Sequence, residues 1–140
     1  MYRLFLLLFA LALAACAPLP PSPQDIEAKR FEAVPDQSVI YIVRPWPDAS
    51  SQAATLWLDD RVMGSTYPGT YFRWVVPPGR HRIAGYAQDS GNITLDTAPG
   101  RVYFVYQTVG RPLGLTGQSF FQLLDERNGR AAVLQSRWPG

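Results

Sequence analysis

The chain has 140 residues, of which 47% are hydrophobic, 13% aromatic and 17% charged. This composition supplies enough apolar side chains for one packed domain, and it excludes a disordered chain, which has few aromatic residues and a high net charge. The 13 basic and 11 acidic side chains nearly balance, so no nucleic-acid partner and no strong attraction to an anionic surface are indicated.

The N-terminus has the organisation of a secretory signal peptide. Arg3 precedes an apolar run from Leu4 to Leu13, and small residues follow this run. A membrane-spanning helix needs about 20 apolar residues, whereas the stretch from Leu4 to Ala15 covers only 12. We therefore expect residues 1–15 to be a cleaved signal peptide rather than a transmembrane anchor.

A cysteine stands directly after this segment, in Leu13-Ala14-Ala15-Cys16. The pattern resembles the bacterial lipobox, in which the signal peptidase recognises the residues before the cysteine, here Leu13, Ala14 and Ala15. The resemblance implies that the Cys16 thiol receives a diacylglyceryl group, so that acyl chains such as palmitate anchor the protein in a membrane. Cys16 is the only cysteine, which excludes disulfide bonds. An ordinary cleaved signal with an incidental cysteine is the alternative.

Residues 16–35 are expected to connect the lipid to a folded domain. The segment Ala17–Pro23 holds four prolines, which favour an extended spacer that reaches on the order of 20 Å and keeps the lipid away from the domain. Ser22 and Pro23 then occupy the N-cap and first-turn positions of a short helix that runs towards Ala33. Pro35 prevents the helix from continuing.

Residues 36–140 are expected to form one all-β domain. Short runs rich in Val, Ile, Tyr, Phe, Trp and Thr alternate with turn residues, which is typical of strands in a β-sandwich. The predicted strands are Ser38–Arg44, Ala53–Asp59, Arg61–Gly64, Thr70–Val76, Arg80–Ala87, Asn92–Thr97, Arg101–Val109 and Ser119–Asp125.

The segments between and after these strands contain turn signals. Asp59-Asp60 predicts a two-residue hairpin turn. The tripeptide Pro-Gly-Arg occurs at residues 78–80 and 99–101, where Pro and Gly suit a type II turn. Gly110–Gly117 is the longest expected loop, and Arg130–Ser136 could form either a last strand or one turn of helix.

Several of these segments together resemble a bacterial lipoprotein family called domain of unknown function 2846. The matching motifs are Val39-Ile40-Tyr41-Ile42-Val43-Arg44-Pro45, Leu58-Asp59-Asp60-Arg61, Val76-Pro77-Pro78-Gly79-Arg80-His81, Val102-Tyr103-Phe104-Val105 and Phe121-Gln122-Leu123-Leu124-Asp125-Glu126. The resemblance covers residues 28–135 and implies an immunoglobulin-like or prealbumin-like β-sandwich of about 7–8 strands. It implies no catalytic residues.

The chain shows no recognisable set of catalytic or metal-binding groups. His81 is its only histidine, and no Gly-x-Ser-x-Gly nucleophile turn is present. We expect His81 to be a hydrogen-bonded imidazole at a strand edge, and one imidazole is too few for a usual zinc site. The neighbouring carboxylates Asp59-Asp60 and Asp125-Glu126 are assigned to a turn and a strand end. No enzyme activity, metal or small-molecule cofactor is predicted.

The aromatic residues leave one candidate for partner binding. Most of the Trp and Tyr side chains are expected to fill the core and outer faces of the sandwich. Trp46 lies in Arg44-Pro45-Trp46-Pro47, where the flanking prolines keep its ring out of a strand and at the surface. Trp and Tyr dominate binding hot spots, so Trp46, with Arg44 beside it, is the predicted contact for a partner.

Together these features predict a non-catalytic lipoprotein of the bacterial cell envelope. Its N-terminal acyl groups would sit in membrane lipid, and its β-sandwich would bind an envelope protein or peptidoglycan. Ala17, instead of Asp, follows the cysteine, and in proteins with similar signals this favours the outer membrane, facing the periplasm. An envelope enzyme acting on glycan, with a site that no motif reveals, is the alternative.

Overall fold

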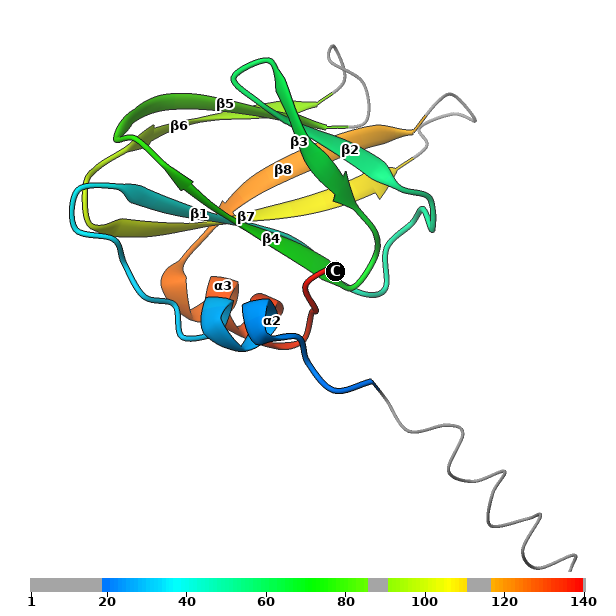
Figure 1. The fold of residues 1–140 in the computed structure, drawn as a ribbon. Coiled ribbons are helices and arrows are strands. Elements are labelled where there is room, and N and C mark those ends of the chain that lie inside the picture. Colours follow the sequence, from blue (N-terminus) through cyan, green and yellow to red (C-terminus); the bar gives the residue numbers. More distant parts are fainter. Residues whose placement is uncertain (1–18, 86–90, 111–116, 140) are drawn as a thin grey trace, which may run out of the picture.

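The computed structural model describes residues 19–85, 91–110 and 117–139, which form a β-sandwich of eight strands with helices against one side (Figure 1). This architecture confirms the all-β prediction. The strands are β1 (Ser38–Arg44), β2 (Ala54–Leu58), β3 (Arg61–Thr66), β4 (Thr70–Val76), β5 (Gly79–Gly85), β6 (Asn92–Thr97), β7 (Arg101–Gly110) and β8 (Gln118–Leu124). The helices are α2 (Pro23–Ala28) and α3 (Glu126–Leu134).

The strands are divided between two four-stranded sheets, in the orders β4-β1-β7-β8 and β3-β2-β5-β6. We call them the covered sheet and the open sheet. In the covered sheet, β1 pairs antiparallel with β4 and parallel with β7. A constant-type immunoglobulin domain instead places its first, second, fifth and fourth strands in one sheet. The strand order of this sandwich therefore differs from that of a constant-type immunoglobulin domain.

The main hydrophobic core lies between the two sheets. Strands of both sheets contribute to it. Along a strand, every second side chain points into this core, because successive side chains point to opposite faces of a sheet. The buried side chains of this core are Ile40, Ile42, Leu56, Leu58, Trp74, Val76, Ile83, Leu95 and Val105.

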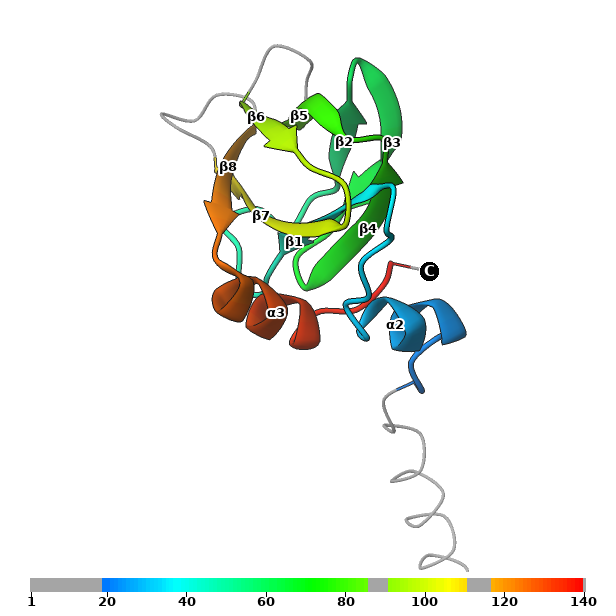
Figure 2. The same cartoon turned by 90° about the vertical axis from the view of Figure 1, so that its left-hand side faces the viewer.

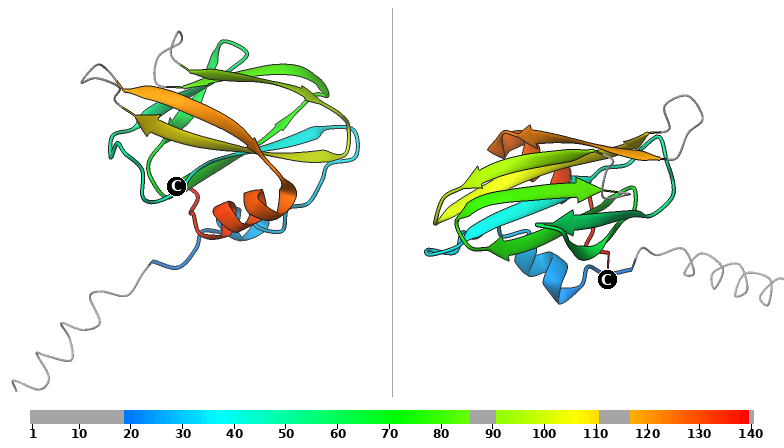
Figure 3. Two further views of the ribbon diagram at one scale, coloured as in Figure 1. Left: turned by 180° about the vertical axis from the view of Figure 1, so that it is seen from behind. Right: turned by 90° about the horizontal axis from the view of Figure 1, so that it is seen from above.

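A second hydrophobic core lies on the outer side of the covered sheet. Helices α2 and α3 cover this side of the sheet (Figures 2 and 3). Tyr41 and Phe104 stack here with ring centroids 5.2 Å apart, and Phe31 lies 5.4 Å from Tyr41. Val133 of α3 is fully buried against them. The covered sheet is consequently packed on both faces, whereas the open sheet is packed on one.

The two helices differ from the sequence expectations. Ser22 caps α2 as predicted, because its side chain accepts a hydrogen bond from the Asp25 amide. The helix ends at Ala28 instead of running to Ala33, because Phe31 adopts a positive φ of 57° and turns its ring into the second core. Near the C-terminus the sequence allowed either a strand or a helix. The structure has the helix α3 there, which begins after the N-cap residue Asp125.

The predicted turns are partly confirmed. Asp59 and Asp60 both have positive φ, 48° and 64°, as a two-residue type I′ hairpin turn requires. Gly100 has a φ of 70°, close to the value that position i+2 of a type II turn requires. Gly79 has a φ of 144° and belongs to β5, so it does not fit this turn position. The two Pro-Gly-Arg tripeptides therefore do not share one turn geometry.

Candidate functional site

The loop that follows β1 is built around a buried arginine. Arg44 is 0% exposed, and its Nε forms an ion pair with Asp48. Its two terminal nitrogens donate to the carbonyl oxygens of Ser50, Gln52 and Thr66. Such a fork of donors suits an arginine, because the guanidinium presents five N–H groups in one plane. The guanidinium thereby holds together the loop from residue 45 to residue 53.

Asp48 ties the same loop to the neighbouring strand. Its carboxylate oxygens accept hydrogen bonds from the backbone amide of Val109 in β7, at 3.1 and 3.2 Å, and from the amide of Ala49. The side chain of Asp48 is only 3% exposed. A buried charge is tolerated where an opposite charge and hydrogen bonds compensate it, and Asp48 has both.

These contacts correct one prediction and confirm part of another. Arg44 cannot contact a partner, because its side chain is fully buried and engaged within the loop. Trp46 does lie at the surface, with 72% of its area exposed. It projects from the loop that Arg44 holds, beside Gly69 of the turn before β4. The binding role of Trp46 stays a prediction.

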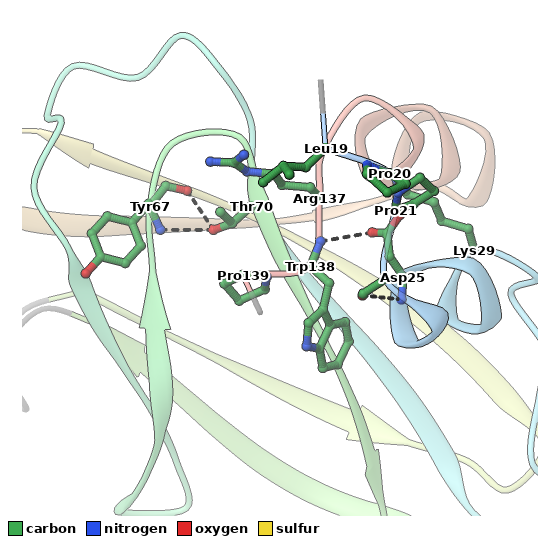
Figure 4. A pocket seen from close by; sticks show the side chains of 11 residues that line it. Leu19, Pro20, Pro21, Asp25, Lys29, Tyr67, Thr70, Arg137, Trp138 and Pro139 are labelled. Carbon is green, nitrogen blue, oxygen red and sulfur yellow. Dashed lines mark hydrogen bonds and ion pairs between the residues drawn. The ribbon is translucent and has the colours of Figure 1, made fainter. Parts of the chain in front are cut away.

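An open groove lies at this same end of the sandwich (Figure 4). Its volume is about 790 Å³. It is bordered by the N-terminal segment, by the turn before β4 and by the C-terminal segment. Its lining includes Leu19, Asp25, Tyr67, Arg137 and Trp138.

Asp25 is the central polar group of this groove. Its carboxylate accepts hydrogen bonds from the Trp138 amide at 2.9 Å and from the Tyr71 hydroxyl at 3.0 Å. It also forms an ion pair with Lys29 at 2.9 Å, and Lys29 donates in turn to the Ser136 carbonyl. These contacts join α2 to the C-terminal segment, so the chain enters the domain at a defined place.

The surroundings of Asp25 keep it ionised. Burial by itself would raise the pKa of Asp25, but the hydrogen bonds from Lys29, Trp138 and Tyr71 outweigh it and lower the pKa below its usual 3.8. A carboxyl that acts as a general acid near neutral pH needs a raised pKa. Asp25 is thus arranged to hold the chain in place rather than to transfer a proton.

The groove also changes the expectation for the spacer. Residues 19–22 line the groove, and Pro23 already belongs to α2. The proline-rich segment is therefore not a free spacer along its whole length, because Ser22 caps α2 and Pro23 belongs to this helix. The lipidation residue Cys16 and the recognition residues Leu13, Ala14 and Ala15 lie outside the described residues.

His81 lies at the opposite end of the sandwich. Its Nδ1 is 2.7 Å from an Asp59 carboxylate oxygen, and its Nε2 is 2.7 Å from the Pro77 carbonyl oxygen. The expectation of a hydrogen-bonded imidazole is confirmed. Burial opposes the charged ring, but the bonds to Asp59 and Pro77 prevail and raise the pKa of His81 above 6.5. Two acceptors facing the two ring nitrogens suit the imidazolium form.

The remaining carboxylate pairs serve local structure. Asp59 and Asp60 form the hairpin turn, and Asp125 accepts from the Asn128 amide as the N-cap of α3. Within the described ranges, no group of three His, Cys, Asp or Glu side chains could hold a metal ion. No helix in the part of the chain that the structure describes is long and apolar enough to cross a membrane.

The sequence reasoning did not identify the groove. No sequence motif marks Asp25, Tyr67 or Trp138 as a functional residue. The groove forms from segments at opposite ends of the chain: the N–H of Trp138 bonds to a residue 113 positions earlier. No local pattern encodes such a contact.

Comparisons with known proteins add little about function. No family model matches the chain, and no solved structure matches it. The chain is similar to an uncharacterized protein of Haemophilus influenzae, with 27% identity over 127 residues that cover 87% of this chain and 75% of that protein.

Proposed function

We propose that this protein is a non-catalytic lipoprotein of the bacterial cell envelope, anchored through Cys16, whose β-sandwich binds another envelope protein. The observation that carries the proposal is the fixed attachment of the N-terminal segment. A lipobox-like cysteine stands three residues before Leu19, and the Asp25 contacts lock the following helix to the domain. A domain held in this way faces its surroundings with the surfaces away from the anchor.

One of these surfaces suits a protein partner. Strand β8 is the last strand of the covered sheet, and its seven residues, Gln-Ser-Phe-Phe-Gln-Leu-Leu, include no charge and no proline. Phe120 and Leu123 are 47% and 48% exposed. Edge strands that must stay unpaired usually carry charged residues or prolines. Ser119, at the start of β8, is buried and lies against Gly91. An extended segment of an envelope protein can therefore add as a further strand to β8 beyond Ser119.

The anchor is tested by mass spectrometry of the protein purified from membranes. We expect the mature N-terminus at Cys16 to carry the mass of acyl chains, and the Cys16→Ala variant to lack it and leave the membrane fraction. A mature protein cleaved at residue 16 with an unmodified thiol would contradict the proposal.

The partner is tested by cross-linking in envelope fractions and identification of the captured proteins. Gln122→Lys places a charge on the β8 edge, and the matched control Thr94→Lys places the same charge at an exposed position of β6, the edge of the open sheet. We expect one reproducible protein partner whose capture falls at least tenfold with Gln122→Lys and not with the control. Recovery of peptidoglycan fragments alone would instead support a cell-wall ligand.

A further inference from the structure

We propose that the end of the sandwich that carries Trp46, Tyr67 and the groove rests in the headgroup layer of the membrane to which the protein is anchored. We call this end the tether face. The inference relies on the proposed lipidation of Cys16 and adds to it a second, non-covalent contact with lipid. It also fixes the orientation of the domain, with the Pro-Gly-Arg turn at residue 99 directed away from the bilayer.

Covalent geometry limits how far the tether face can lie from the lipid. Leu19 lines the groove, and only two residues, Ala17 and Pro18, separate it from Cys16. A fully extended chain covers at most about 3.6 Å per residue, so the Cα atom of Cys16 lies within roughly 11 Å of the Cα atom of Leu19. The headgroup region of one leaflet is about 5–8 Å thick. The tether face cannot withdraw far from this layer.

The exposed side chains of the tether face match the chemistry of the layer. Trp46 is 72% exposed and Tyr67 is 50% exposed. Both have an apolar ring and a polar group, the combination that concentrates Trp and Tyr at membrane–water interfaces. Leu19, at 89% exposed, adds apolar area, and the exposed Arg137 supplies a positive charge at the groove.

The two carboxylates beside these residues, Asp25 and Asp48, do not repel the lipid headgroups. The side chains of Asp25 and Asp48 are 5% and 3% exposed and form ion pairs with Lys29 and Arg44. Neither carboxylate therefore presents a free negative charge to lipid phosphates.

The loop that carries Trp46 is also held in shape before any contact forms. Arg44 bonds to the carbonyl oxygens of Ser50, Gln52 and Thr66, and Asp48 bonds to β7. A ring presented by a preformed loop loses less conformational entropy on binding than one on a flexible loop. The buried charges near Trp46 thus support the exposed ring.

The test uses the full-length lipidated protein in vesicles of phosphatidylethanolamine and phosphatidylglycerol. Ala49 is exposed on the Trp46 loop, and Ala98 is exposed between β6 and β7 at the opposite end. Each is replaced by cysteine and labelled with an environment-sensitive fluorophore. The native cysteine does not compete for the label, because acylation occupies its thiol.

We expect the Ala49→Cys label to shift to shorter emission wavelength in vesicles and to be quenched at least twofold by headgroup-proximal nitroxide lipids. The Ala98→Cys label should keep the emission it has in water. Adding Trp46→Ala should reduce the quenching at position 49. Equal, water-like emission from both labels on vesicle-bound protein would overturn the inference and leave the lipid anchor intact.

Two further results separate the inference from the proposed function. An unmodified Cys16 thiol and failure of the protein to float with vesicles would overturn both. Capture of an envelope protein that is lost with Trp46→Ala, combined with a water-like label at position 49, would assign Trp46 to a protein contact and overturn the membrane contact alone.

Discussion

The two sheets of the sandwich use charged residues in opposite ways. In the covered sheet all seven residues of β1 are buried, and the arginine that ends this strand is neutralised inside the protein by Asp48. The open sheet has one face towards solvent, where Arg80 and Asp96 form an ion pair with side chains 74% and 72% exposed. Solvent screens this exposed pair, whereas the buried pair at the end of the covered sheet holds the tether face in shape.

The largest expected effect comes from Arg44. Replacing it by methionine leaves Asp48 as a buried charge without its partner, which costs about 3–5 kcal/mol. Urea denaturation followed by circular dichroism measures the loss. The double variant Arg44→Met with Asp48→Asn removes the uncompensated charge and should recover part of the stability. A loss below about 1 kcal/mol for Arg44→Met would show that the loop does not depend on the guanidinium.

The helix over the covered sheet is tested at Gly129. This glycine of α3 is buried, and a Cβ there would overlap the ring of Phe104. In an exposed helix, Gly→Ala stabilises by about 1 kcal/mol. Here we expect Gly129→Ala to destabilise by about 1–3 kcal/mol, because the helix must move off the sheet. The sign of the change in unfolding free energy decides between close packing and a loosely attached helix.

In the open sheet, His81 should make stability depend on pH. Its folded pKa is raised above 6.5, so protonation favours the folded state. This contribution is complete below about pH 6.5 and disappears as pH rises through the folded pKa. The stability difference between the wild type and His81→Gln should be larger at pH 5.5 than at pH 8.5. Because His81 is the only histidine, NMR titration of its ring reads the folded pKa directly; a value below 6.5 would contradict this account.

The smallest effect is expected at the exposed ion pair. Arg80→Ala removes the contact with Asp96, which solvent screens at both side chains. The urea midpoint should stay within experimental error of the wild type, in contrast with Arg44→Met. A marked loss of stability would mean that the open sheet depends on its surface charges as well.

Local patterns predicted most strand positions in this protein. The strands Ser38–Arg44, Thr70–Val76 and Asn92–Thr97 have the predicted bounds, because β-branched and aromatic runs between turn residues favour extended backbone. The Asp59-Asp60 turn and the Ser22 cap also follow from short-range chemistry.

Other features required the folded chain. The parallel pairing of β1 with β7 joins residues more than 60 positions apart, and no short segment specifies it. The prediction that Arg44 contacts a partner was wrong for the same reason. Its sequence neighbours suggested a surface loop, but its buried guanidinium donates to acceptors that include the Thr66 carbonyl oxygen, 22 positions away. Short-range geometry and periodicity thus determined the elements, whereas burial and the groove depended on which distant segments met.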